Sequence, residues 1–316
     1  MAATGLRRFP LEQPGDMAGI KREKENGNSL NPVMNMSRQC FAIACKDEKR
    51  ITKDERRIMK KRPLGSTGLD VSVLGLGTVK IGRNEQVKYP EGFEIPDDNA
   101  VRELFELAQS LGINFIDTAP AYGSSEQRLG ELLPNRHDWV IVTKTGEIFE
   151  NGQSRFDFSY DYTIGSVEQS LKRLKRDVVD VVLVHSDGND MDIINNTGVF
   201  DALVSLKERG LIRAYGMSSK TVEGGCRVVE SADVVMATAN LAHDDERPVL
   251  ELAQKLNKGV IIKKGLQSGH AAGAGGVEAS FRHILTLPGV SSMIVGTINP
   301  AHLQENVAMV NTILSS

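Results

Sequence analysis

Three short apolar runs of this chain end on residues that can move or polarise a proton. Asp117, Lys144 and His185 each stand at the end of such a run, and Tyr122 follows Asp117 in the stretch Asp-Thr-Ala-Pro-Ala-Tyr-Gly. Packing alone would not choose ionisable side chains at three such positions. We therefore expect these four residues to form a catalytic group.

The residue types suit acid catalysis by a tyrosine. A tyrosine hydroxyl has an ordinary pKa of about 10, and a nearby ammonium stabilises the phenolate and lowers that pKa. Tyr122, Lys144 and Asp117 can form such a relay, in which the carboxylate holds the ammonium in place. His185 has two distinct ring nitrogens and can hydrogen-bond a substrate carbonyl oxygen. Taken singly, each residue also fits a structural role, as a paired lysine, a satisfied histidine or a loop cap.

The elements that must position these residues alternate between strands and helices. Strand-type runs cover residues 71–77, 115–117, 140–144, 178–185, 212–217, 234–238, 259–263 and 293–297. Helical patterns cover residues 99–110, 126–133, 163–174, 200–209, 222–231, 248–257, 277–287 and 301–314. The strand runs are nearly all apolar, as expected when both faces of a parallel sheet are covered. Eight such units in about 250 residues predict an α/β fold, a closed (β/α)8 TIM barrel, whose active site lies at the C-terminal strand ends.

Residues 1–58 differ from the rest of the chain. They hold 12 Lys plus Arg and eight acidic residues, with scattered Pro and Gly and no sustained periodicity. Such a segment cannot bury enough apolar surface to offset its ordering entropy. We expect a disordered extension at residues 1–58, followed by the barrel domain at residues 59–316. Met59 and the Lys-Lys-Arg-Pro-Leu-Gly after it look like a natural beginning, so a start placed too far upstream is one hypothesis for the extension.

Composition argues against several classes of partner. The net charge is -3 and the isoelectric point is about 6.1, and no basic stripe interleaved with aromatic residues offers a nucleic-acid surface. No apolar stretch approaches the roughly 20 residues that cross a bilayer, and no signal peptide opens the chain. Cysteines and histidines lack metal-ligand spacing. We expect no nucleic-acid partner, no membrane contact, no metal and, by default, a cytoplasmic location.

Together the motifs resemble the aldo-keto reductase family from about Lys61 to the C-terminus. They are Leu-Gly-Leu-Gly-Thr at residues 74–78, the Asp117 to Gly123 stretch with Ser125 and Glu126 after it, Lys144, His185, Gly-Met-Ser-Ser at residues 216–219, and the segment 296–306. The resemblance implies that a small-molecule aldehyde or ketone is reduced by hydride from a nicotinamide cofactor. It also implies Tyr122 as general acid, Lys144 and Asp117 tuning it, and His185 orienting the carbonyl.

The same resemblance implies cofactor binding without a dinucleotide-binding glycine fingerprint, which this sequence lacks. The segment 296–306 leaves the last predicted strand and enters a helix whose first N–H groups can bind phosphate. Thr297 and His302 are expected at the adenosine 2′-phosphate, and Glu305 and Asn306 at the adenine. Ser218 is expected at the nicotinamide carboxamide. The whole expected set is Gly77, Thr78, Ser218, Ser219, Lys263, Gly296, Thr297, His302, Glu305 and Asn306.

Several positions depart from the family's pattern. The family usually has Arg near His302, and a neutral histidine is a weaker phosphate partner than a forked guanidinium. We expect NADPH as the cofactor, with NADH as an alternative. Ser219 stands where Asn is common, Met236 where Gln is common, and Lys263 roughly where a Tyr often stacks on the nicotinamide.

These departures leave two other functions open. One is a barrel that binds the cofactor as a regulatory or scaffold module with little catalytic turnover. The other is a lyase that forms a Schiff base on Lys263 or Lys264 at the end of an apolar strand. The lyase would leave the segment 296–306 without a role.

Overall fold

The computed structural model describes residues 58–87, 89–90, 92–273 and 276–316. The predicted extension at residues 1–58 lies outside the described residues, apart from Ile58. The described chain joins the fold at Met59, whose side chain is buried and whose backbone N–H donates to Leu111 O at 2.8 Å. A domain boundary at residue 59 stays a prediction.

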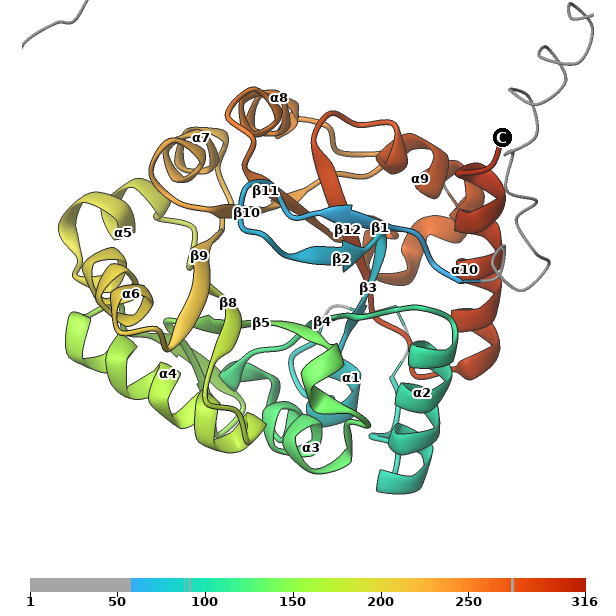
Figure 1. Cartoon of the computed structure of the whole chain (residues 1–316), viewed down its shortest axis with the longest axis horizontal. Helices are drawn as coiled ribbons and strands as arrows, with labels where there is room; N and C mark the ends of the chain where they lie inside the picture. Colours follow the sequence, from blue (N-terminus) through green and yellow to red (C-terminus); the bar gives the residue numbers. More distant parts are fainter. Residues whose placement is uncertain (1–57, 88, 91, 274–275) are drawn as a thin grey trace, which may run out of the picture. The chain divides into compact units, whose positions relative to one another are not determined.

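Within this described part, eight parallel strands close into a barrel, and helices form an outer ring around them (Figure 1). Around the barrel the order is β3, β4, β5, β8, β9, β10, β11 and β12, which returns to β3. The strands are β3 (Leu74–Gly77), β4 (Phe115–Asp117), β5 (Val140–Thr145), β8 (Val179–His185), β9 (Ile212–Ser218), β10 (Val234–Thr238), β11 (Gly259–Lys263) and β12 (Val290–Val295). The predicted (β/α)8 barrel is confirmed.

Helices follow the barrel strands in the chain and cover their outer faces. They are α2 (Asp98–Ser110), α3 (Ser125–Leu132), α4 (Tyr160–Leu174), α6 (Val199–Glu208), α7 (Val222–Ser231), α8 (Arg247–Lys255), α9 (Gly276–Leu285) and α10 (Pro300–Ile313), with the short α1 (Val79–Gly82) and α5 (Asp190–Asn196). Side chains of Asp97, Ser159, Thr221 and Asn299 accept hydrogen bonds from the first free N–H groups of α2, α4, α7 and α10. These polar caps explain where the four helices begin.

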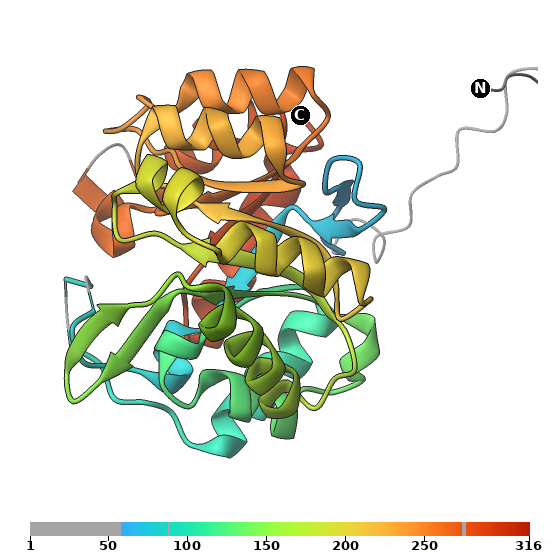
Figure 2. The same cartoon turned by 90° about the vertical axis from the view of Figure 1, so that its left-hand side faces the viewer.

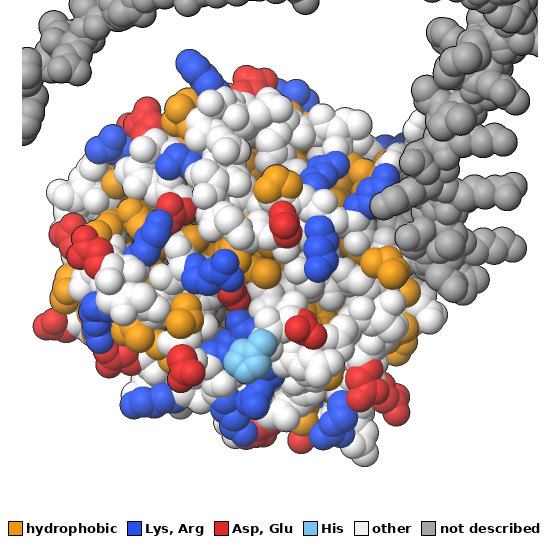
Figure 3. Space-filling view, in the orientation of Figure 1, with side chains coloured by type: hydrophobic (Ala, Val, Ile, Leu, Met, Phe, Trp, Pro, Cys, Tyr) orange, Lys and Arg blue, Asp and Glu red, His pale blue; other side chains and the backbone are white. Residues whose placement is uncertain are grey.

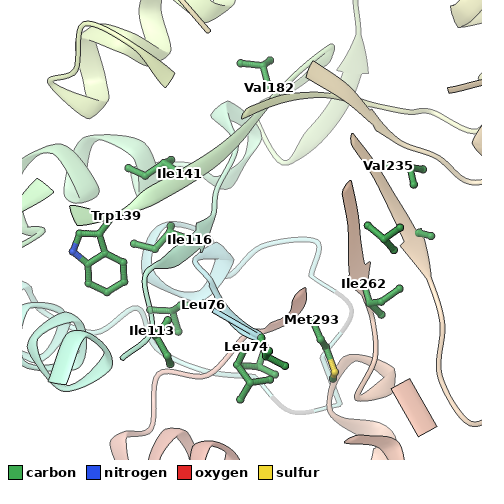
Figure 4. Close-up of a cluster of buried hydrophobic side chains, with 14 of the residues drawn as sticks. Leu74, Leu76, Ile113, Ile116, Trp139, Ile141, Val182, Val235, Ile262 and Met293 are labelled. Carbon is green, nitrogen blue, oxygen red and sulfur yellow. The ribbon is translucent and has the colours of Figure 1, made fainter. Parts of the chain in front are cut away.

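Two apolar layers hold the barrel together, one on each face of the strands. The outer layer lies between strands and helices, and Figure 4 shows part of it, including Leu76, Ile116 and Ile262. The inner layer fills the barrel and includes Val181 and Met236. Because most residues on both faces of the strands are buried, the strands read as mainly apolar runs rather than as strictly alternating ones.

A short antiparallel hairpin closes the N-terminal end of the barrel. It consists of β1 (Lys61–Pro63) and β2 (Asp70–Ser72), and its side chains Leu64, Leu69 and Val71 are buried within the inner layer. The sequence predicted one strand at residues 71–77. The structure divides that run at Val73, because β2 pairs with β1 while β3 enters the barrel.

A second hairpin, which the sequence analysis missed, lies at the opposite end of the barrel (Figure 2). It consists of β6 (Glu147–Glu150) and β7 (Gln153–Phe156), joined by Asn151 and Gly152. Both turn residues have positive φ, as the type I′ turn of a two-residue hairpin requires. The Asn-Gly pair was therefore the signal that could have found this hairpin.

The surface of the described residues carries both signs of charge. On the face that bears the β1–β2 hairpin, lysine and arginine side chains are interspersed with acidic ones rather than gathered into one strip (Figure 3). Among the helices of the described ranges, none has the length and apolar character needed to cross a membrane.

Candidate active site

The structure brings all four predicted catalytic residues together at one cavity. Asp117 ends β4, Lys144 lies in β5, His185 ends β8, and Tyr122 ends the 3-10 helix η2 (Pro120–Tyr122) that follows β4. All four line a cavity of about 300 Å³ at the C-terminal ends of the strands. This volume is at the lower limit of small-molecule sites. The catalytic roles of the four residues stay predictions.

Lys144 and Asp117 form a buried ion pair in the wall of the cavity. Lys144 Nζ donates to Asp117 Oδ1 at 2.5 Å and to Thr118 O at 2.9 Å. The two side chains are 2% and 8% exposed. They meet because β4 and β5 are hydrogen-bonded neighbours. Such a pair is fixed in place, since loss of either partner would leave a buried charge uncompensated.

Tyr122 lies beside this ion pair and stays protonated. Lys144 Nζ lies 4.7 Å from the centroid of the Tyr122 ring. Burial raises the pKa of the Tyr122 hydroxyl well above its ordinary value, Asp117 and Glu147 raise it further, and Arg83 lowers it. The net pKa is therefore raised, contrary to the expectation of a hydroxyl made more acidic by its surroundings. The ammonium is paired with Asp117, whose negative charge acts on the same hydroxyl.

His185 faces Tyr122 across the cavity edge. The two ring centroids are 6.2 Å apart, and the ring planes are nearly perpendicular, at 85°. Burial lowers the pKa of His185, Glu147 opposes that shift, and the positive charges of Lys144 and Lys263 add to it. The imidazole is therefore neutral at neutral pH.

Glu147 is a residue of this site that sequence reasoning missed. Its Oε2 lies 2.7 Å from His185 Nδ1, and its side chain is 12% exposed. It opens the β6–β7 hairpin only three residues after Lys144. Recognition of the Asn-Gly turn would have placed Glu147 at the C-terminal end of the barrel, where active sites of this fold lie.

Four of the ten residues expected at the cofactor line the same cavity. Gly77 ends β3, Ser218 ends β9, Lys263 ends β11, and Gly296 follows β12. At the two glycines the wall is closely packed, because an added Cβ would lie 2.9 Å from Ile294 Cγ2 at Gly77 and 3.0 Å from the Tyr89 hydroxyl at Gly296. These four positions surround the space beside Tyr122, as a nicotinamide next to the reacting carbonyl requires.

Lys263 is hydrogen-bonded to the end of β9, the strand on the far side of β10. Its Nζ donates to Ser218 Oγ at 2.8 Å and to Ser219 O at 2.5 Å. Burial lowers the pKa of Lys263 to about 7, although Glu246 opposes the shift. The Ser218 hydroxyl accepts from Lys263 and keeps its own proton to donate. A hydroxyl and an ammonium side by side suit the carbonyl oxygen of a nicotinamide carboxamide, so the residues present fit this cofactor.

Two further expected cofactor residues lie behind the cavity wall. Thr78 is buried, donates from Oγ1 to Asp117 O at 2.8 Å and accepts from Ser125 Oγ at 2.7 Å. Ser219 is fully buried, and its Oγ is near the position that a Cβ on Gly225 would take. Both side chains support the wall in this structure.

The last four expected cofactor residues lie at the start of α10. Asn299 Oδ1 accepts from the N–H groups of Ala301 and His302, at 2.9 and 3.4 Å. These N–H groups are therefore already capped, which leaves side chains such as the exposed His302 to meet a phosphate. The four residues are Thr297, His302, Glu305 and Asn306.

Known proteins resemble this chain over most of its length. The model of the Aldo/keto reductase family matches residues 73–280. A protein of Pseudomonas aeruginosa, solved as a candidate aldo-keto reductase, is 54% identical, with a TM-score of 0.74 over 80% of this chain and 95% of that one. The uncharacterized oxidoreductase YqkF of Bacillus subtilis is 29% identical over 80% of this chain and 92% of its own. The L-galactose dehydrogenase of Arabidopsis thaliana is 29% identical over 80% of this chain and 89% of its own.

The family match includes the strands that carry the four site residues. It begins at Val73, directly before the first barrel strand, and extends into α9, so it spans most of the barrel. The similar Pseudomonas structure agrees with it in fold as well as in sequence. The chain belongs to the aldo/keto reductase family and is an oxidoreductase that reduces carbonyl compounds with a nicotinamide cofactor.

Proposed function

We propose that Tyr122 is the general acid of carbonyl reduction, that His185 orients the carbonyl, and that the Lys144 and Asp117 pair fixes the site. One observation carries this proposal. The phenol and the imidazole stand at one cavity with ring centroids 6.2 Å apart, and an ammonium lies 4.7 Å from the phenol ring. A carbonyl oxygen between the two rings can meet both.

The reaction requires one proton from the protein. When bound, the nicotinamide cofactor supplies a hydride to the carbonyl carbon. Tyr122 gives its proton to the carbonyl oxygen as negative charge develops there. A raised pKa does not prevent this step, because an alkoxide is a stronger base than a phenolate. The positive charge of Lys144 then stabilises the phenolate until a proton from solvent replaces the one that was lost.

We further propose that NADPH is preferred and that NADH is also accepted. His302 is exposed at the start of α10, in the segment expected to meet the 2′-phosphate. An imidazole offers one hydrogen bond where a guanidinium fork offers two. A small preference for NADPH follows.

The substrate class proposed here is a small aldehyde, short aldoses included. The cavity of about 300 Å³ is lined by the expected nicotinamide residues as well as by the four catalytic candidates, so the share left for a substrate favours a small molecule. The similar protein of Arabidopsis thaliana is named an L-galactose dehydrogenase, which adds support for sugars. Family membership argues against the Schiff-base lyase.

The test is turnover by the purified full chain with each reduced cofactor and a panel of small aldehydes. Tyr122→Phe removes only the acidic hydroxyl and should lower kcat by about 10²- to 10⁴-fold, the usual contribution of general acid catalysis. Cofactor affinity should stay nearly unchanged. Tyr160→Phe, at an exposed tyrosine of α4, is the matched control. Full activity in Tyr122→Phe would refute the assignment, and tight cofactor binding without turnover on any aldehyde would favour the scaffold function.

A further inference from the structure

Glu147 stands against the buried side of the His185 ring. Its Oε2 is 2.7 Å from Nδ1, a nitrogen that is shielded from solvent. The ring N–H does not point straight at the oxygen, so the contact is a close ion-pair distance rather than a well-aligned hydrogen bond. His185 also lines the cavity. Because Nδ1 faces Glu147 and is shielded from solvent, Nε2 is the ring nitrogen that a molecule in the cavity can contact.

The carboxylate of Glu147 is held from two other directions. Ser154 Oγ, on β7, donates to Glu147 Oε1 at 2.6 Å. Arg83 Nη1 lies 3.7 Å from the same oxygen and also donates to Ala121 O at 3.0 Å, in the helical turn that carries Tyr122. The hairpin and the turn with the tyrosine are therefore joined through one guanidinium.

These contacts keep Glu147 ionised. Burial by itself raises the pKa of Glu147, but His185, Ser154 and Arg83 outweigh it and bring that pKa to about 2. An ionised carboxylate only accepts hydrogen bonds. The proton of a neutral His185 ring is therefore favoured on Nδ1, facing Glu147, which leaves Nε2 as an acceptor.

An acceptor at Nε2 is the wrong partner for a carbonyl oxygen. Both atoms carry lone pairs, so the neutral ring repels the oxygen that it is expected to orient. Only a ring that has gained a second proton can donate from Nε2 while it keeps Nδ1–H toward Glu147. The charged groups around the ring are Glu147 on β6, Lys144 on β5 and Lys263 on β11, and Tyr122 on η2 faces it.

We propose that Glu147 is a positioning residue that holds the His185 proton on Nδ1, so that carbonyl reduction requires His185 to take up a second proton. This inference rests on the proposed function of His185. It distinguishes the site from one in which a neutral histidine donates from Nε2 at every pH.

A pH profile follows with a definite sign. The pKa of His185 is lowered from its ordinary value by burial, so the doubly protonated ring forms only in the acidic range. Reductive kcat/KM should rise as the pH falls toward the pKa of His185. Above that pKa it should fall by about tenfold for each pH unit, because one proton must be taken up.

Glu147→Gln is the decisive variant. The glutamine amide has nearly the same shape, and the donors Ser154 and Arg83 should keep its oxygen at the Oε1 position. Its NH2 group then donates to Nδ1, so the ring proton moves to Nε2 and the neutral ring can hold the carbonyl. Reductive kcat/KM should then lose its dependence on His185 protonation and exceed that of the unmodified enzyme at alkaline pH. Glu150→Gln, at an exposed carboxylate of the same hairpin, is the matched control and should keep the original profile.

Nitrogen-15 NMR of the histidine ring reads the tautomer directly, with His185→Asn to assign the signal. We expect Nδ1–H in the unmodified full chain and in Glu150→Gln, and Nε2–H in Glu147→Gln. Nε2–H in the unmodified chain, or an unchanged pH profile in Glu147→Gln, would overturn the proposal. If the chain shows no reductase turnover at all, the proposed function fails, while the NMR measurement still decides where the proton lies.

Discussion

Replacing Lys144 with methionine separates what the buried ion pair does for stability from what it does for catalysis. Methionine is close to lysine in length but has no charge, so the Asp117 carboxylate would stay buried without its cation at 2.5 Å. Leaving one member of a buried pair uncompensated costs about 3–5 kcal/mol of unfolding free energy. We expect Lys144→Met to lose that amount, which lowers Tm by roughly 6–10 °C for a domain of about 250 residues.

The double variant Asp117→Asn with Lys144→Met removes both charges together. It should regain most of the lost unfolding free energy, because no buried charge is left without a partner. Turnover should not return, since the phenolate of Tyr122 would have no cation beside it. Urea unfolding measures the free energies, and aldehyde reduction by each variant measures the turnover.

A more exposed pair of similar geometry provides the control. Lys207 Nζ lies 2.6 Å from Asp233 Oδ2, but the two side chains are 39% and 23% exposed. Lys207→Met should therefore cost no more than about 1 kcal/mol. If Lys144→Met loses no more unfolding free energy than Lys207→Met, burial does not set the cost of removing the lysine and the reasoning is refuted. Recovery of turnover in the double variant would show that the phenolate does not need the lysine.

Two predictions concern the cofactor. Lys263, whose pKa burial lowers to about 7, can donate to the carboxamide oxygen whether charged or neutral, but below that pH its charge should also repel the cationic ring of the oxidised cofactor. The Kd of the oxidised cofactor should fall as the pH rises through about 7, and Lys263→Met should abolish this dependence. Calorimetry at several pH values checks both expectations. An unchanged pH dependence in Lys263→Met would contradict the assignment. His302→Arg should raise the preference for NADPH over NADH by roughly 10- to 100-fold, the worth of one added charge-assisted pair. Equal kcat/KM ratios before and after that change would place the 2′-phosphate elsewhere.

The sequence was sufficient for the barrel because its strands are buried on both faces. Runs such as residues 181–184, Val-Val-Leu-Val, show this burial as apolar stretches without alternation, and helices with polar caps separate such runs. Strand ends in a parallel barrel share one rim, so Asp117, Lys144 and His185 had to meet there. The irregular elements were harder to predict, since β6 and β7 are short and only the Asn-Gly turn marks them.

Protonation in the site could not be read from residue types alone. The pKa of Tyr122 is raised by burial and by the carboxylates of Asp117 and Glu147, which only the folded structure brings near the hydroxyl. Glu147 reaches His185 across 38 positions of the chain. The hydrogen bond from Lys263 to Ser218 joins two strand ends that are 45 positions apart in the chain. Such pairings are fixed by the folded barrel rather than by local pattern.

The β1–β2 hairpin with Leu64 closes the N-terminal end of the barrel, and the side chains of the inner apolar layer fill its interior. Cofactor and substrate must then both enter and leave at the C-terminal end of the barrel. Whichever of the two binds second covers the one that bound first. Cofactor and substrate are then expected to bind and leave in a fixed order, because the inner apolar layer leaves the cavity one open end.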